Sequence, residues 1–200
     1  MYFLLLCILS STGIFFTFKI IDRYNIPSYP VIVINYLIAA IPAAFLASGT
    51  FTFSYILHSD WLLLAILIGV LFILMFFVIA ATTSKAGISV TTVASKMSVV
   101  IPITFSILID VNDRLTLIKG AGIIFALTGV LLTVWNPDKG KSNIKSILLP
   151  VLLFFGMGII DSLVKFSQHK YVPEESSAAF TSALFGISFL TGLKIGRAHV

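Results

Sequence analysis

The sequence predicts an all-α protein, a polytopic bundle of membrane helices. The 200-residue chain is 58% hydrophobic and only 10% charged, with a mean hydropathy of +1.09. This composition leaves too little polar surface to cover a soluble domain. Seven apolar stretches of about 18 to 22 residues are each long enough to cross a bilayer core. They lack the alternation of barrel strands, so each is expected to be a helix that satisfies its own backbone hydrogen bonds.

Short polar connectors separate the seven expected spans, so consecutive helices should be antiparallel neighbours. The spans are Tyr2 to Phe18, Pro30 to Ala47, Trp61 to Ala81, Ile88 to Ile109, Leu115 to Trp135, Ile144 to Ser167 and Ser177 to Leu193. The longest polar break, residues 136–143, carries Pro137, Gly140 and three charges. It is the best candidate boundary between two structural halves.

The sixth and seventh spans resemble a restart of the first two. An offset of 146 residues that places Lys19 on Lys165 also places Pro27 on Pro173. We therefore expect a five-helix repeat at 1–135, a connector at 136–143 and the first two helices of a second repeat at 144–193. Five is odd, so the second copy would enter the membrane inverted, as in many secondary transporters, whose substrate site lies near the midplane between the halves.

The last residues, 194–200, do not fit this plan. They read Lys-Ile-Gly-Arg-Ala-His-Val. Back-translated as AAG-ATC-GGA-AGA-GCA-CAC-GTC, they reproduce the start of a common sequencing adapter. We expect a non-native tail, in which Arg197 and His199 carry no function and seven spans are present of ten in the whole protein. The alternative is a natural basic tail that flanks the membrane.

Spans four and five carry the most recognisable motifs. These are Ile101-Pro102, then Asn112-Asp113-Arg114-Leu115-Thr116, then Gly120, Gly122 and Gly129-Val130. They resemble the EamA-like unit of the drug/metabolite transporter superfamily, although Asp113 stands where that family usually has Glu. The resemblance covers residues 1–135 as one unit and about 50 more as the opening of a second. It implies ten helices, alternating access, and export or uptake of small metabolites.

Several of these residues also have structural roles that elementary chemistry predicts. Asp113 or Thr116 can cap the free amides at the start of span five. The glycines of span five and the series Ala39, Ala43 and Ala47 in span two would let helix backbones approach closely. Prolines inside spans, Pro42 and Pro102, are expected to kink them and to supply hinges.

Lys96 is the outstanding polar residue, some nine residues into the fourth span. A lysine at the bilayer centre costs about 2.5 to 3.5 kcal/mol on insertion scales, so it usually faces a cavity or a partner. Such a lysine could hold the carboxylate or phosphate of an anionic metabolite, or exchange a proton if burial favours its neutral form. The alternative is that Lys96 reaches the membrane surface because span four begins later.

Asp161 is the second charged candidate, and it precedes Lys165 by one helical turn. An intrahelical ion pair is therefore the alternative to a binding role. Hydroxyl and amide side chains in spans one, two and four could line a polar path, unless the hydroxyls bond back to their own helices. The expected substrate-binding residues are Lys96, Ser95, Thr92, Asn35, Ser11 and Asp161.

The remaining singled-out residues are aromatic or sulfur-containing. Trp61 and Trp135 lie at span ends, which favours the interfacial aromatic belt, whereas Tyr36 could belong to a cavity wall or to this belt. The single cysteine, Cys7, excludes an intramolecular disulfide and is expected to be a small buried apolar residue. No cofactor or metal is expected.

An enzyme is not expected, because His58 and His169 lie in connectors and neither an HExxH pair nor a Gly-x-Ser-x-Gly turn occurs. The +5 charge is spread over connectors, which argues against nucleic-acid binding. The sequence therefore predicts a secondary transporter of a small organic solute, amino-acid-like or anionic, with proton or ion coupling as an option. The alternative is a non-transporting structural or assembly protein.

The expected location is the lipid bilayer of the cytoplasmic (inner) membrane. Lysine and arginine are somewhat more numerous in the connectors after spans one, three and five. The positive-inside rule therefore favours an outside N-terminus, whereas the resemblance implies inside termini. Both orientations stay open.

Overall fold

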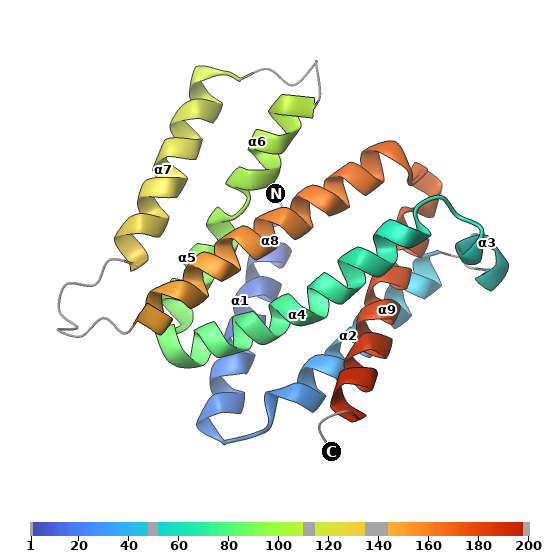
Figure 1. Ribbon diagram of the computed structural model, residues 1–200, viewed down its shortest axis with the longest axis horizontal. Helices are drawn as coiled ribbons and strands as arrows, with labels where there is room; N and C mark the ends of the chain where they lie inside the picture. Colours follow the sequence, from blue (N-terminus) through green and yellow to red (C-terminus); the bar gives the residue numbers. More distant parts are fainter. Residues whose placement is uncertain (1, 48–51, 110–114, 135–143, 198–200) are drawn as a thin grey trace. The chain divides into compact units, whose positions relative to one another are not determined.

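The computed structural model describes residues 2–47, 52–109, 115–134 and 144–197, and every regular element in these ranges is a helix (Figure 1). The elements are α1 (Tyr2–Arg23), α2 (Ser28–Leu46), α3 (Phe53–Leu57), α4 (Leu62–Ala86), α5 (Ile88–Met97), α6 (Val100–Ile109), α7 (Leu117–Val134), α8 (Ile144–Lys170), the 3-10 helix η1 (Glu174–Ser176) and α9 (Ser177–Arg197). The all-α fold class is confirmed.

Six helical segments are long and apolar enough to cross a membrane. They are α1, α2, α4, the segment formed by α5 and α6, α8 and α9. The seventh expected span forms α7, whose described apolar part, Leu117–Leu132, is shorter than the others. The length and composition of these helices fit a multi-pass membrane protein. Seven spans and an inverted repeat stay predictions.

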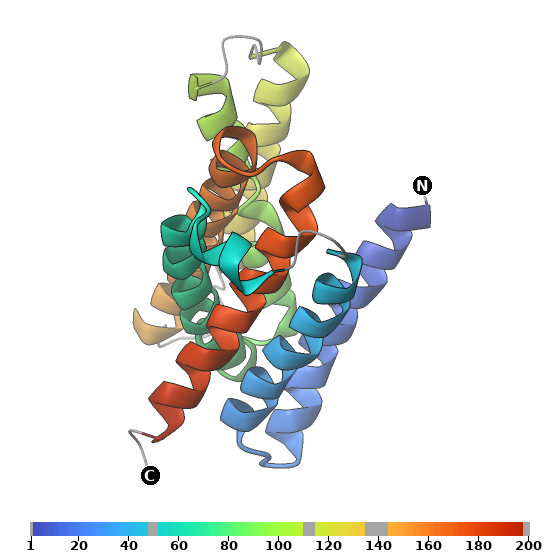
Figure 2. The ribbon, with the colours of Figure 1, turned by 90° about the vertical axis from the view of Figure 1, so that its right-hand side faces the viewer.

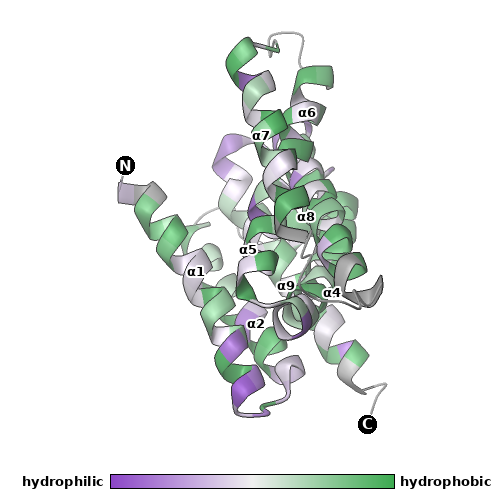
Figure 3. Cartoon of the chain, turned by 90° about the vertical axis from the view of Figure 1, so that its left-hand side faces the viewer, coloured by the Kyte–Doolittle hydropathy of each residue, from purple (hydrophilic) through white to green (hydrophobic). Residues whose placement is uncertain are grey.

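The outer faces of these helices are suited to lipid rather than to water. Large apolar side chains stand almost fully exposed, for example Leu117 at 95% and Ile118 at 86%. Hydrophobic residues run along the helices, while hydrophilic ones gather at the turn between α1 and α2 (Figure 3). In water such apolar surfaces would drive aggregation, whereas lipid tails cover them without penalty.

The chain forms two compact units, which we describe separately. Unit 1 comprises Met1–Ser28 and Val78–Ile159, and unit 2 comprises Tyr29–Phe77 and Ile160–Val200. Helices α4 and α8 each contribute residues to both units. The predicted repeat boundaries are a separate matter and stay a prediction, since the connector 136–143 lies outside the described residues.

In unit 1, Gly87 alone joins α4 to α5. Its backbone lies at φ +93° and ψ 164°, a region open essentially to glycine. Its amide donates to the carbonyls of Thr82 and Thr83 at 3.2 and 3.1 Å, which closes α4. Its carbonyl accepts from the amide of Thr91 at 3.2 Å and from the Thr91 hydroxyl at 2.8 Å, which opens α5. A single residue therefore ends one helix and starts the next.

Replacing Gly87 with alanine is expected to destabilise the protein by about 1–3 kcal/mol, because a side chain strains this backbone conformation. An added Cβ would meet no atom within 4 Å, so strain and not a clash is the cause. Unfolding of the purified protein in mild detergent measures the effect. Gly13→Ala in α1 is the control, since its Cβ also meets open space and helical alanine is favoured. Equal stability of the two variants would contradict the prediction.

The sequence predicts a kink at Pro102, and the structure has a break at residues 98–99, just before this proline, which divides span four into α5 and α6. Proline has no amide hydrogen, so the carbonyl of Ser98 lacks the donor that a regular helix would place four residues later. That carbonyl instead accepts the amide of Ile101 at 2.9 Å. The helix therefore breaks one turn before the proline. Pro42, the other predicted kink site, lies inside α2. Pro150 lies inside α8 and was not among the predicted kink sites.

Helix α7 begins with the cap predicted for Thr116. The amide of Lys119 donates to the Thr116 hydroxyl at 3.3 Å. This confirms Thr116 as the N-cap residue, while the other candidate, Asp113, lies outside the described residues. The close-packing role predicted for the glycines of α7 is wrong in this structure, because a Cβ on Gly120, Gly122 or Gly129 would meet nothing within 4 Å.

In unit 2, α2 and α9 run side by side (Figure 2). The hydroxyl of Ser182 in α9 donates to the carbonyl of Ala40 in α2 at 3.0 Å. Ser188 in α9 donates to the carbonyl of Gly69 in α4 at 2.8 Å. Hydroxyl bonds and small residues at helix contacts are typical of packing in membranes, where no hydrophobic force acts between helices. The buried Ala43 and Ala47 support the packing role predicted for that series.

The tryptophan of unit 2 corrects a prediction. Trp61 is only 1% exposed and packs edge-to-face on Phe180, with ring centroids 5.5 Å apart. The prediction that it belongs to an interfacial belt is therefore wrong, because the ring is enclosed by unit 2. Trp135 lies outside the described residues.

Candidate functional site

The structure brings together two of the predicted binding residues, Lys96 and Ser11, in unit 1. Lys96 occupies the last turn of α5, and its Nζ donates to the Oγ of Ser11 in α1 at 2.8 Å. Ser11 in turn donates to the carbonyl of Cys7 at 2.7 Å. The ammonium, the hydroxyl and the carbonyl form a short hydrogen-bonded chain, in which each bond polarises the next.

Contacts between helices position this chain. Helix α1 packs along α5, and at its C-terminal end Asp22 accepts a hydrogen bond from Ser84 of α4 at 2.8 Å. Alpha-helical spacing then places Thr92 on the same face of α5 as Lys96, since residues four apart are neighbours, whereas Ser95 is adjacent in the chain and lies about 100° around the helix. Thr92 and Ser95 are both half-buried. We call Lys96, Ser11, Thr92 and Ser95 the Lys96 site.

Other hydroxyls follow the structural alternative. Thr12 donates to the carbonyl of Ile8, and Thr91 donates to that of Gly87, each at 2.8 Å. Such bonds satisfy the hydroxyl within its own helix and leave it without a role in binding. Ser11 differs because its oxygen also accepts from a charged group on another helix.

The Lys96 site carries a positive charge that no anion balances within the described part of the chain. There, Ser11 is the one polar side chain recorded as bonded to Lys96. A neutral hydroxyl orients the ammonium but does not neutralise it. The C-terminal end of α5 favours a cation by about 0.3–1 kcal/mol. A carboxylate or phosphate would bind such a group more strongly, through charge-assisted hydrogen bonds.

The other two predicted residues belong to unit 2. Asn35 is exposed on α2, and Asp161 is half-buried on α8, one turn before the exposed Lys165. Their predicted place in one cavity with Lys96 stays a prediction, as does the ion pair between Asp161 and Lys165.

Tyr36 is a buried polar residue whose environment only the structure reveals. Its side chain is 1% exposed, and its hydroxyl has no hydrogen-bond partner in the described structure. Phe76 packs edge-to-face on its ring at a centroid distance of 5.1 Å, and Phe185 lies at 6.0 Å. Sequence reasoning left Tyr36 open between a cavity wall and the interfacial belt, and no sequence signal shows that its hydroxyl is unpaired.

Metal ligands and the cysteine can be placed as well. Among residues 2–47, 52–109, 115–134 and 144–197, no three His, Cys, Asp or Glu side chains lie close enough to hold a metal ion. Cys7 is exposed on α1, so the prediction that it is buried is wrong. Cys7 contacts the Lys96 site only through its backbone carbonyl, which accepts the hydrogen bond from Ser11. Any other residue type would supply the same carbonyl.

Comparison with known proteins gives one informative match. A protein of Haemophilus influenzae described as uncharacterized is 30% identical in an alignment of 195 residues, and the match covers 94% of this chain and 64% of that relative. The chain thus spans a little under two thirds of the relative's length. No family model matches the sequence. No solved structure matches it either.

Proposed function

We propose that this protein is a secondary transporter that moves a small organic solute bearing a carboxylate or phosphate across the cytoplasmic membrane. The observation that carries the proposal is the hydrogen bond from Lys96 Nζ to Ser11 Oγ. A lysine inside a span that meets only a neutral partner in the described chain is suited to an anionic substrate group. The EamA-like motifs of spans four and five and the six apolar helices support the same reading.

The mechanism that we propose uses the hydroxyls as well as the charge. Ser11 holds the ammonium of Lys96, and an arriving anion replaces or bridges this contact. Thr92 lies one helical turn before Lys96 on the same face and would donate a further hydrogen bond to the anion. The break between α5 and α6, next to Pro102, supplies a hinge close to Lys96 for alternating access. Proton or ion coupling remains part of the proposal.

Ligand binding and flux test this function. We would first screen amino acids and small organic acids for compounds that raise the melting temperature of the purified protein, in the longest form that its gene encodes. A ligand at 100 times its Kd stabilises by about 2.7 kcal/mol. Uptake of the radiolabelled hits into liposomes is then compared between wild type and Lys96→Met. We expect at least about a tenfold loss of flux, because one charge-assisted hydrogen bond contributes about 1.5–3 kcal/mol.

Two variants control this experiment. Lys85→Met removes an exposed lysine at the end of α4 and should retain flux. Lys96→Arg keeps the charge and should retain more flux than Lys96→Met, if charge is the requirement. Unchanged flux in Lys96→Met would remove this residue from the mechanism. If no compound stabilises the protein and none is transported, the structural or assembly function is favoured instead.

A further inference from the structure

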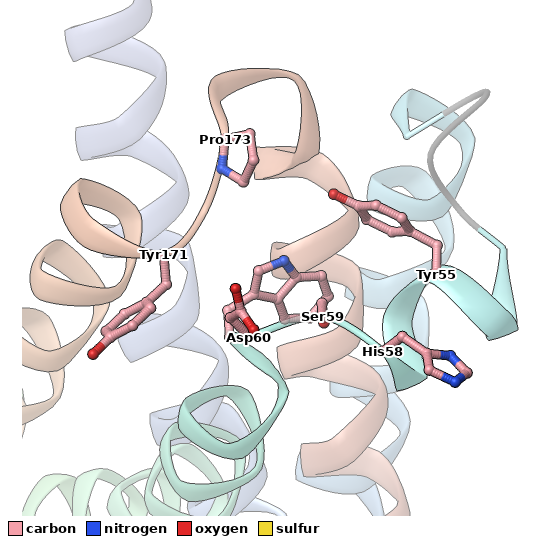
Figure 4. Close-up of a pocket in the computed structure, with 7 residues that line it drawn as sticks. Tyr55, His58, Ser59, Asp60, Tyr171 and Pro173 are labelled. Atoms are coloured by element: carbon pink, nitrogen blue, oxygen red, sulfur yellow. The ribbon is translucent and has the colours of Figure 1, made fainter.

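A small polar pocket lies in unit 2, where the turn between α3 and α4 meets the connector between α8 and η1 (Figure 4). Its volume is about 260 Å³. The lining residues are Tyr55, His58, Ser59, Asp60, Trp61, Tyr171 and Pro173. We call it the Asp60 pocket. These segments flank the membrane helices, so the pocket opens outside the apolar spans.

One wall of the Asp60 pocket carries a negative charge. The carboxylate of Asp60 and the hydroxyl of Tyr55 both point into the space below Pro173, whereas the imidazole of His58 points away from it (Figure 4). His58 Nδ1 is instead bonded to the carbonyl of Ser54 at 2.8 Å. For Asp60, no hydrogen bond or ion pair is recorded within the described part of the chain. Its carboxylate is therefore available to an ammonium group.

The Asp60 pocket also has a hydrogen-bond donor suited to an oxyanion. Trp61 is 1% exposed, and its indole Nε1 is a buried donor without an acceptor among the described residues. A buried donor without a partner destabilises a protein, so an acceptor oxygen supplied by a ligand would be favoured there.

From these groups we infer that the Asp60 pocket binds a small zwitterion, a molecule with an ammonium group and an oxyanion close together. Asp60 accepts from the ammonium, and the oxyanion accepts from Trp61 Nε1. The rings of Tyr55 and Trp61 add cation–π attraction for the ammonium. This site is separate from the Lys96 site, and its residues play no part in the proposed transport step.

Two sources offer this chemistry, namely a free amino acid and the headgroup of phosphatidylethanolamine. Fluorescence distinguishes them, because the chain has two tryptophans, Trp61 and Trp135. In Trp135→Phe, Trp61 is the sole reporter. This protein is titrated in detergent with L-alanine, and in parallel with methylammonium and acetate, which each carry half of the zwitterion. The same protein in nanodiscs of phosphatidylethanolamine is compared with nanodiscs of phosphatidylglycerol.

We expect a saturable fluorescence change with L-alanine, or a shifted emission in phosphatidylethanolamine relative to phosphatidylglycerol. The first result assigns the pocket to a free amino acid, and the second assigns it to a lipid headgroup. Asp60→Asn should weaken the response at least about tenfold, because a charge-assisted hydrogen bond is lost. Glu175→Gln, an exposed acid nearby that does not line the pocket, is the matched control and should leave the response unchanged.

Other results would overturn the inference. One is the absence of any response to L-alanine together with identical emission in the two lipids. Another is an equal response from methylammonium or acetate alone, since the site would then not require both charges. An unchanged response in Asp60→Asn would also overturn the inference, because the carboxylate would then not hold the ammonium; Asp60 is exposed, so the substitution is expected to change stability little. None of these outcomes bears on flux through Lys96, so the two proposals fail independently.

Discussion

Gly158→Ala is expected to destabilise the protein, because it overpacks a close helix contact in unit 1. A Cβ on Gly158 would lie 2.7 Å from Cβ and 2.8 Å from Cγ1 of Ile101, closer than real side chains approach. Cβ of Ile101 is fixed directly to the backbone, so relief requires α6 and α8 to move apart. Overpacking of this kind destabilises by about 1–3 kcal/mol, and occasionally by more.

The control for this prediction is Gly122→Ala in α7, where an added Cβ meets nothing within 4 Å. Alanine there should be neutral or stabilise by up to about 1 kcal/mol, because alanine favours helix more than glycine does. Unfolding in a denaturing detergent compares the two variants. Adding Ile101→Ala to Gly158→Ala should recover part of the loss, since it removes the clashing atoms. If the double variant is no more stable than Gly158→Ala, the contact with Ile101 is not the cause.

Tyr36→Phe is expected to act in the opposite direction and stabilise the protein by about 1–3 kcal/mol. The buried hydroxyl has no partner, so its removal ends a desolvation penalty and leaves the ring contacts with Phe76 and Phe185 in place. The same unfolding assay measures the gain.

A matched tyrosine gives the contrast. Tyr55 shares a hydrogen bond of 2.6 Å with Ser176, so Tyr55→Phe breaks a bond that is made and should destabilise by about 0.5–1.5 kcal/mol. Opposite signs for the two Tyr→Phe variants are the expected result. If Tyr36→Phe also destabilises the protein, the Tyr36 hydroxyl has a partner in solution, such as a bound water. The prediction that this hydroxyl is unpaired would then be wrong.

Much of the fold could be predicted because a bilayer imposes a local rule. A segment must be apolar over a fixed length, and that property is visible without knowledge of its neighbours. The starts of α5 at Ile88, α8 at Ile144 and α9 at Ser177 agree with the predicted spans. The Thr116 cap and the break near Pro102 also follow from local chemistry, since each depends on atoms within one helical turn.

The side-chain environments were harder to predict, for a physical reason. In a water-soluble helix an apolar stripe marks the buried face, but lipid is as apolar as a protein core, so a membrane helix can be apolar all round. Hydropathy therefore could not show that Trp61 is buried while Cys7 is exposed. It also could not show which glycines lie at helix contacts, and this is why the α7 glycines were assigned a packing role that Gly158 holds instead.

For the candidate site, too, one part follows from the sequence and another part only from the tertiary structure. The sequence by itself determined that a lysine lies inside an apolar span with the Thr92 hydroxyl on the same helical face, because helix periodicity is a property of one segment. Only the tertiary structure decided that Ser11, 85 residues away in the chain, is the partner of Lys96. That pairing depends on how α1 packs against α5, and contacts between distant segments arise from the packing of whole helices, which no single stretch of sequence specifies.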